Sequence, residues 1–313
     1  MCCFKAILGG VMWLFLSCVV QNTDDTQKEV WDSSILEPSQ PDSSIASEPS
    51  SIDTGEWPSD PWVVIGGGVW HTCAVDQNKQ THCWGRNLEG QSEPPQDVPF
   101  REVTGGRLFS CGLSFDSFVH CWGDYSFTVP QERFLSISAG KDFLCGIVED
   151  QSILCAGFSH DPPVGTFTKI DAGNGHVCAV NTVRKVECFG DNASGQCSSP
   201  DDSFDIVQAG FFHSCAQNSD GVQCWGSAQD GATNVPIAQG VGLWTGNYHN
   251  CILNSNQQAV CWGGESFDLD GGIVGARFRA LHLGGFHTCG LTLEDGIFCD
   301  GENTQGQTEV PVD

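Results

Sequence analysis

The chain has 313 residues, with 39 acidic and 13 basic side chains, a formal net charge of −26 and 18 cysteines. Because a surface this negative repels phosphate backbones, the charge balance disfavours nucleic-acid binding. A reducing cytosol would leave so many thiols idle or metal-bound, whereas an oxidising compartment would pair them. The composition therefore favours a protein that folds outside the cytosol.

The first 18 residues have the features of a secretory signal. Lys5 precedes an apolar run over residues 6–16, which is shorter than the ~20 residues of a membrane-spanning helix and suits the apolar core of a signal peptide. The run ends in Phe15-Leu16-Ser17-Cys18, which resembles the bacterial lipobox. We therefore expect a signal peptide over residues 1–18, with Cys18 lipidated as a cell-envelope anchor; the alternative is simple secretion.

Residues 19–61 are rich in Ser, Asp, Glu, Pro and Thr and hold ten acidic residues against one lysine. Apolar residues are too sparse there to bury a core, which predicts a disordered acidic tether. Such a tether would hold a folded domain away from a membrane. The folded part is then expected over residues 62–313, which are acidic in their own right, with 29 carboxylates and 11 basic side chains.

From residue 62 onward the chain repeats seven times with a period of about 36 residues. Each unit carries two cysteines, ten residues apart in six units and nine apart in the fifth. The pairs are Cys73 with Cys83, Cys111 with Cys121, Cys145 with Cys155, Cys178 with Cys188, Cys215 with Cys224, Cys251 with Cys261, and Cys289 with Cys299.

Other residues recur with the same period as the cysteine pairs. An apolar strand and a glycine precede each pair, and an aromatic residue with a glycine follows it in five units. Three units continue into Asn-x-x-Gly-Gln, as at residues 87–91. A histidine lies two residues before the first cysteine in five units: His71, His176, His213, His249 and His287. Buried hydrogen bonds between blades are the role that we expect for these histidines.

The order of these signals predicts an all-β fold. Each unit reads as strand, Gly-rich turn, strand, tight hairpin, strand, loop and short edge strand, with hairpin turns such as Ser219-Asp220-Gly221. No stretch after residue 60 has a helical period of apolar residues. Short β units with a fixed period form closed rings of sheets, so we predict a seven-bladed β-propeller.

The pattern resembles the repeat of the regulator of chromosome condensation family, which has Gly-Gly and His before one strand, an aromatic-Gly after the next, and an Asn-x-x-Gly-Gln tail. The resemblance covers residues 62–313 and implies the same propeller fold. The best-known activities of the family are nucleotide exchange on a small GTPase and chromatin binding, both intracellular. The signal sequence, the cysteines and the acidity argue against carrying either activity over to this chain.

The spacing within a pair places both cysteines on facing strands of one hairpin. Pairing Asn218 with Gly221 brings Cys215 opposite Cys224; directly facing residues have Cα atoms about 4.5 Å apart, which a disulfide tolerates. We therefore predict one intrablade disulfide in each of seven blades. The alternative is zinc bound by His-x-Cys and the second cysteine. It lacks the short Cys-x2–4-Cys knuckle of structural zinc sites, and two units have phenylalanine in place of the histidine, so we expect no metal.

Cys197 follows the tail of the fourth unit and has no partner in the repeat. We predict a free thiol there, with an intermolecular bridge as the alternative. The sequence has no Gly-x-Ser-x-Gly elbow, no Walker loop and no His-Glu-x-x-His. Adjacent acids such as Asp201 and Asp202 read as a solvated face. We therefore expect no catalytic residues and no cofactor.

Propellers bind partners on the rim, where loops converge. Candidate contacts are aromatic residues that break the repeat: Tyr125, Phe127, Phe158 and Phe267. The alternative is that these rings pack between blades. We predict a monomeric, extracytoplasmic scaffold, either a cell-envelope lipoprotein or secreted, that binds an unknown protein partner. The alternatives are a carbohydrate-binding or hydrolytic propeller that uses a channel lined by charged residues, and, by family analogy, a nucleotide exchange factor.

Overall fold

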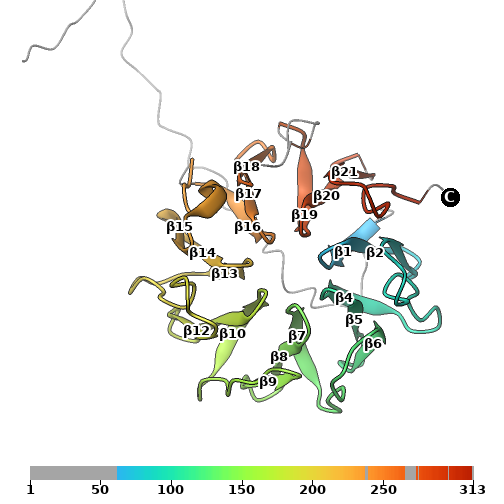
Figure 1. Cartoon of the computed structure of the whole chain (residues 1–313), viewed down its shortest axis with the longest axis horizontal. Coiled ribbons are helices and arrows are strands. Elements are labelled where there is room, and N and C mark those ends of the chain that lie inside the picture. Colours follow the sequence, from blue (N-terminus) through green and yellow to red (C-terminus); the bar gives the residue numbers. More distant parts are fainter. Residues whose placement is uncertain (1–61, 237–238, 265–272, 274, 295, 312–313) are drawn as a thin grey trace, which may run out of the picture. The chain divides into compact units, whose positions relative to one another are not determined.

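The computed structural model describes residues 62–236, 239–264, 273, 275–294 and 296–311. Over these residues the chain forms seven antiparallel sheets of three strands each, which follow one another around a ring as the blades of a β-propeller (Figure 1). Each blade is one repeat of the sequence, so the predicted all-β, seven-bladed fold is confirmed. The expected signal peptide, Cys18 and the tether over residues 19–61 lie outside the described residues.

The strands are numbered in chain order, three to a blade. Blades 1 and 2 contain β1 (Trp62–Gly67), β2 (His71–Asp76), β3 (Thr81–Gly85), β4 (Phe100–Gly105), β5 (Phe109–Ser114) and β6 (Val119–Gly123). Blades 3 and 4 contain β7 (Phe134–Ala139), β8 (Leu144–Val148), β9 (Ile153–Ala156), β10 (Phe167–Ala172), β11 (His176–Asn181) and β12 (Val186–Gly190).

Blade 5 contains β13 (Ile206–Ala209), β14 (His213–Asn218) and β15 (Gly221–Gly226), followed by a short 3-10 helix, η1 (Gln229–Gly231). Blades 6 and 7 contain β16 (Val241–Thr245), β17 (His249–Leu253), β18 (Ala259–Gly263), β19 (Phe278–Leu283), β20 (His287–Thr292) and β21 (Ile297–Gly301). No helix among the described residues is long and apolar enough to cross a bilayer.

The core lies between neighbouring blades. The first strand of each blade is nearest the centre of the ring (Figure 1), and the middle strand is the most deeply buried; every residue of β5 is buried, for example. A phenylalanine opens the inner strand of four blades and is almost fully buried against the preceding blade: Phe100, Phe134, Phe167 and Phe278. Burying such a side chain contributes ~1.5–3 kcal/mol.

The predicted disulfides are present, one in each blade. The two cysteines face each other across the middle and outer strands, as Cys215 and Cys224 do in the register of β14 with β15. The Cα atoms of the seven pairs are 4.0 to 4.1 Å apart. Because both sulfurs belong to one blade, each disulfide staples its own blade and does not join it to the next. Bonded sulfurs also offer no thiolate to zinc.

The Asn-x-x-Gly-Gln tail forms a turn, and the expected short fourth strand is absent from the described part of each blade. After β3, the Asn87 side chain accepts a hydrogen bond from Ser92 N at 3.1 Å, and the Gln91 side chain accepts one from Glu89 N at 3.1 Å. Gly90 has a φ of +81°, which residues with a Cβ disfavour. The tail thus bonds its own backbone, and its Gln91 O accepts hydrogen bonds from Ser110 Oγ and Trp122 Nε1 of blade 2.

The ring closes between blade 7 and blade 1 by the kinds of contact that join the other blades. Gly285 N of blade 7 donates a hydrogen bond to Val69 O of blade 1 at 2.9 Å. Trp84 Nε1 of blade 1 donates to Gln307 O, in the tail of blade 7, at 3.0 Å. Since no disulfide crosses this seam within the described residues, packing and hydrogen bonds hold the ring shut.

Candidate functional site

The repeat histidines join neighbouring blades. In five blades the histidine Nε2 lies 2.7 to 2.9 Å from a polar side-chain oxygen of the next blade. His176 Nε2 is 2.8 Å from Ser214 Oγ, which itself donates to Gln196 O at 3.0 Å. The serine therefore accepts, so His176 donates from Nε2. Burial lowers the pKa of His176 to about 4 and keeps it neutral at pH 7. The predicted role in buried hydrogen bonds between blades is confirmed.

In blades 2 and 3 a phenylalanine replaces the repeat histidine, and the residue that it contacts in the next blade is apolar instead of polar. Phe109 of blade 2 packs in one cluster with Leu144 of blade 3, and Phe143 of blade 3 with Val177 of blade 4. The residues that meet a histidine are all polar: Thr72, Ser110, Ser214, Asn250 and Thr288. A polar pair and an apolar pair are each satisfied, whereas a mixed pair leaves a buried polar group without its partner.

This pairing rule predicts a strong coupling between His176 and Ser214. We expect His176→Phe alone to destabilise the protein by about 1–3 kcal/mol, because a buried polar contact is lost. Ser214→Val in the same chain should recover part of that loss, because the seam then matches Phe143 with Val177. Urea unfolding of the wild type, both single variants and the double variant measures the coupling. Effects that add within about 0.5 kcal/mol would contradict the rule.

The aromatic residues predicted to contact a partner lie at seams between blades. Tyr125 and Phe127 pack against Phe109, with ring centroids 6.2 and 5.3 Å from it. Phe158 stacks on Phe143 at 4.2 Å. These rings fill the seams in which phenylalanine replaces histidine, which is the packing role that competed with partner contact. Phe267 lies outside the described residues, and contact of any of the four with a partner stays a prediction.

Cys197 is half-buried and is not joined to another cysteine. Its Sγ donates a hydrogen bond to Asp191 O at 3.2 Å. Burial, together with the nearby Asp191 carboxylate, raises the pKa of the Cys197 thiol to about 11. Because the thiolate is the nucleophilic form, this thiol is protonated and poorly reactive at pH 7.

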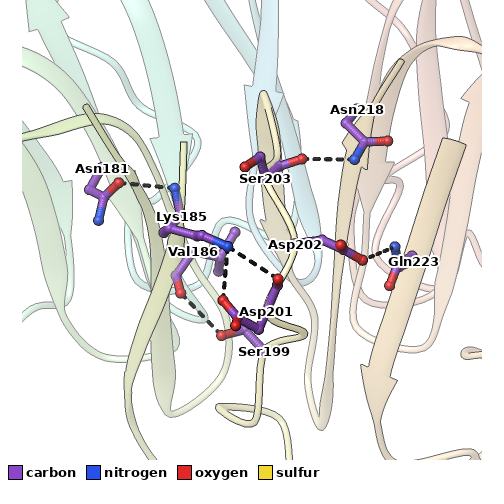
Figure 2. A network of polar contacts seen from close by, with 9 residues as sticks. All are labelled: Asn181, Lys185, Val186, Ser199, Asp201, Asp202, Ser203, Asn218 and Gln223. Carbon is purple, nitrogen blue, oxygen red and sulfur yellow. Dashed lines mark hydrogen bonds and ion pairs between the residues drawn. The ribbon is translucent and has the colours of Figure 1, made fainter. Parts of the chain in front are cut away.

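The adjacent acids after β12 link blade 4 to blade 5 (Figure 2). Lys185 Nζ donates to Asp201 Oδ1 at 2.8 Å, and Gln223 Nε2 of blade 5 donates to Asp202 Oδ2 at 2.8 Å. Both carboxylates are exposed, as expected for a solvated face. Through these partners the two carboxylates connect blade 4 with blade 5.

Three aromatic rings from neighbouring blades stack in a row. Phe211 of blade 5 and Tyr248 of blade 6 have ring centroids 5.4 Å apart and planes inclined by 15°. Tyr248 and Phe286 of blade 7 are 5.2 Å apart with an inclination of 17°. All three side chains are half-buried and belong to the loops between inner and middle strands. We call Phe211, Tyr248 and Phe286 the aromatic row.

The aromatic row is not part of the blade-building repeat. At the same positions, one and two residues before the repeat histidine or phenylalanine, blades 2 to 4 have non-aromatic residues: Arg107-Leu108, Lys141-Asp142 and Asn174-Gly175. Blades 2 and 3 nevertheless keep the backbone bond across their seam, from Arg107 N to Lys141 O at 2.8 Å. The backbone bond between neighbouring blades is therefore also made in a seam that lacks the row.

The inner strands surround a central channel of about 1150 Å³, lined by residues of all seven blades. Basic and acidic side chains both reach its lining: Arg101, Lys141, Lys169 and Arg279 against Glu102 and Asp171. Over residues 62–313, by contrast, carboxylates outnumber basic groups. The fold thus concentrates basic groups around its axis and places most carboxylates elsewhere.

The two channel carboxylates hold neighbouring inner strands. Glu102 accepts a hydrogen bond from Ile137 N at 3.3 Å, and Asp171 accepts from Ala209 N at 2.7 Å and from Ser138 Oγ at 3.0 Å. Burial raises the pKa of each carboxyl to about 7, although these hydrogen bonds lower it. Among the described lining residues, four basic side chains stand against these two carboxyls.

The chain matches no family model. Among solved structures it is similar to the ectodomain of the receptor kinase CR4 from Physcomitrella patens, with a TM-score of 0.66 and 24% identity over 76% of this chain and 72% of that one. It is also similar to the CRINKLY WD40 ectodomain of the Arabidopsis thaliana receptor kinase ACR4, with a TM-score of 0.64 and 26% identity over 76% of this chain and 96% of that one. The likeness to these ectodomains agrees with the propeller fold.

A looser match is yeast RCC1 (Prp20), solved with Kap60 bound, with a TM-score of 0.47 and 14% identity over 78% of this chain and 70% of that chain. The seven disulfides point by themselves to folding in an oxidising compartment.

Sequence reasoning missed both the aromatic row and the charge of the channel. A signal for the row was present, because the residue before the repeat histidine is aromatic in blades 1, 5, 6 and 7 and in no other blade. The channel lining was harder to find. Its residues come from positions scattered along seven inner strands, and only closure of the ring brings them to one axis.

Proposed function

We propose that this protein is an extracytoplasmic, non-catalytic scaffold that binds a protein partner through the face carrying the aromatic row. The aromatic row carries the proposal, because three half-buried rings stack side by side where the repeat does not require them. Aromatic side chains supply a large share of binding energy at protein interfaces, since they bury much area at a small cost in conformational entropy.

Blade 1 adds to the same face. Trp70 directly precedes its repeat histidine, as Tyr248 and Phe286 do in their blades. The Arg86 guanidinium lies 5.5 Å from the centre of the Trp70 ring, and tryptophan with arginine is a frequent combination at binding hot spots. The similar plant structures are ectodomains of receptor kinases, which supports a binding role for a propeller of this build.

We also propose how the protein is anchored to the cell envelope and which type of repeat forms its blades. Residues 1–18 would be a signal peptide, and lipidated Cys18 would hold the monomer at the cell envelope. Residues 19–61 would act as a spacer. Residues 62–313 would consist of seven repeats of the chromosome-condensation regulator type. The mass of the mature protein without reductant tests the anchor. We expect a chain that begins at an acylated Cys18. An unmodified N-terminus would instead indicate that the protein is secreted without a lipid anchor.

Removing the aromatic row should abolish partner binding and leave the fold intact. We expect Tyr248→Ser with Phe286→Ser to lower the recovery of a cross-linked partner from intact cells about tenfold or more, as loss of interface hot spots does. Phe298→Ser is the matched control, because Phe298 is 38% exposed and lies on the outer strand β21. Thermal unfolding of each variant checks the fold.

Two outcomes would overturn the proposal. One is that wild-type protein cross-links to no partner reproducibly. The other is that a reproducible partner is recovered equally well by the folded Tyr248→Ser, Phe286→Ser variant, which would place its binding on another surface.

A further inference from the structure

We infer that a partly open hollow on blade 5 binds the guanidinium group of an arginine side chain that the protein partner supplies. The hollow is lined by Phe212, Ser227, Asp230 and Ala232 of blade 5 and by Tyr248 of the aromatic row. We call it the blade 5 hollow. Because the arginine would belong to the partner that binds at the aromatic row, this site rests on the proposed function.

Blade 1 shows how the fold holds an arginine at the equivalent place. The Arg86 guanidinium donates two hydrogen bonds to the Glu89 carboxylate, from Nε at 3.0 Å and from a terminal nitrogen at 2.6 Å. The centre of the guanidinium lies 5.5 Å from the centre of the Trp70 ring. Paired bonds of this kind fit the planar guanidinium, and the face of an aromatic ring attracts its charge. A carboxylate and a ring together therefore bind the cation.

Blade 5 has the same backbone arrangement without the arginine. Ser227 N donates a hydrogen bond to Phe212 O at 2.8 Å. In blade 1 the same bond joins Arg86 N to Trp70 O at 2.9 Å, so Ser227 stands where blade 1 has its arginine. Asp230 lies three residues after Ser227, which is the spacing of the blade 1 ion pair. Blade 5 thus has the ring and the carboxylate, but residues 227–232 contain no basic side chain.

The Asp230 carboxylate lacks both partners that Glu89 has in blade 1. Gln91 Nε2 donates to Glu89 at 3.1 Å, whereas blade 5 has Ala232 at that position. Within the described part of the chain, no side chain forms an ion pair or a hydrogen bond with the Asp230 carboxylate. Asp230 is half-buried, and a charge that is withdrawn from water without a partner is costly in free energy. A cation from outside the chain would supply that partner.

Ala232 leaves the space that the incoming group needs. Ala232 O accepts a hydrogen bond from Trp262 Nε1 at 3.0 Å, as Gln91 O accepts one from Trp122 Nε1 at 2.8 Å, so the two residues occupy the same place in their blades. The Gln91 side chain is fully buried there, but that of alanine ends at Cβ. The hollow leaves about 10 Å³ for the centre of a water-sized group, which is enough for one terminal nitrogen of a guanidinium.

The backbone of Asp230 is strained. Its φ of +56° and ψ of +20° lie in the left-handed region, which residues with a Cβ disfavour. The residues at the same place in the tails of blades 1, 4 and 7 have no positive φ: Glu89, Ser194 and Gln305. Because strained residues concentrate at binding sites, the conformation of Asp230 supports a binding role for the blade 5 hollow.

The charge of the protein and the blade 1 geometry favour arginine over other cations. Residues 62–313 have 29 carboxylates and 11 basic side chains, so they attract a basic partner before contact. The ammonium of lysine is a compact charge that cannot reproduce the paired bonds between Arg86 and Glu89. Calcium sites usually combine several carboxylates, whereas Asp230 is the one carboxylate in the lining of this hollow.

NMR titration of the mature protein with the tripeptide acetyl-Gly-Arg-Gly-amide tests the inference without the partner. We expect saturable shifts of the backbone amides of residues 227–232. The same tripeptide with citrulline, which has the shape of arginine without its charge, should not bind. Asp230→Asn should weaken binding about tenfold or more, because charge-assisted hydrogen bonds are lost. Asp220→Asn is the matched control, because Asp220 is exposed in the hairpin of the same blade, and it should leave the affinity unchanged.

A second variant, Ser227→Arg, places an arginine where blade 1 has Arg86. We expect its guanidinium to pair with Asp230 and to block the tripeptide, while thermal unfolding shows that the blade stays folded. Asp230→Asn should also lower the recovery of the cross-linked partner from intact cells about tenfold.

The inference is overturned if the arginine tripeptide does not bind at millimolar concentrations, or if the citrulline or a lysine tripeptide binds equally well. Unchanged binding in folded Asp230→Asn would overturn it as well. Partner recovery that falls when the aromatic row is removed but not in Asp230→Asn would overturn this inference alone and leave the proposed function standing. Failure of the proposed function would instead appear in the aromatic-row variant, whatever the tripeptide does.

Discussion

Reduction of the seven disulfides is expected to unfold the protein. Each closes a loop of nine or ten residues, which the chain-entropy model values at about 2–3 kcal/mol. Seven such contributions together exceed the ~5–15 kcal/mol by which folded domains are usually stable. Urea titrations with and without reductant, followed by near-ultraviolet circular dichroism, measure the effect. A fully reduced and alkylated protein that keeps its native spectrum would contradict this expectation.

Removing one disulfide should destabilise the protein far less than reducing all seven. We expect Cys145→Ala with Cys155→Ala to cost about 2–3 kcal/mol and to leave the ring folded, because each disulfide lies within one blade and joins no seam. The first cysteine of every pair is at most 1% exposed. Reductant alone should therefore act slowly, and urea should accelerate it, because thiol exchange requires access to the sulfur.

The fold could be predicted because its information is local and repeated. A pair such as Cys215 and Cys224 fixes the register of one hairpin, and seven copies of that hairpin with their glycines and tails leave few arrangements other than a ring. The tail was the exception. The sequence predicts a loop and a short edge strand at the end of each unit, but after β3 the side chains of Asn87 and Gln91 bond the backbone of their own turn, and no strand forms there.

The candidate sites could not be predicted to the same degree, because they are made by contacts between blades. His176 and Ser214 are 38 residues apart, and nothing local shows that one meets the other. The same holds for Phe211 and Tyr248, which stack only when their blades are neighbours. Tyr125 and Phe158 stood out in sequence because they break the repeat, yet their rings fill seams where phenylalanine replaces histidine.

Acidification is expected to destabilise the ring between pH 6.5 and pH 4. Burial lowers the pKa of six histidines, to about 3 or about 4 in four of them: His71, His176, His249 and His282, with His213 and His287 also lowered. The usual pKa of histidine is about 6.5. The unfolded chain therefore takes up protons in this range that the folded protein does not bind, and stability falls as pH falls.

Glu102 and Asp171 oppose this trend without reversing it. Their pKa values are raised to about 7 in the folded protein, so the folded state binds two protons that the unfolded chain releases above about pH 4. Six histidines against two carboxyls leave a net loss of stability, of the order of several kcal/mol, as the pH falls from 6.5 to 5. Stability should therefore be greatest near neutral pH, as urea titrations at a series of pH values can show.

The same histidines determine where the ring should open. Histidine pairs lie at the seams between blades 4, 5, 6, 7, 1 and 2, whereas Phe109 and Phe143 hold the seams from blade 2 to blade 4. Hydrogen exchange at pH 5 should therefore show protection lost first in blades 5 to 7 and retained longest in blades 2 to 4. The His176→Phe, Ser214→Val variant extends the apolar block to blade 5 and should flatten the pH dependence. Uniform loss of protection around the ring would mean that histidine protonation does not open the seams.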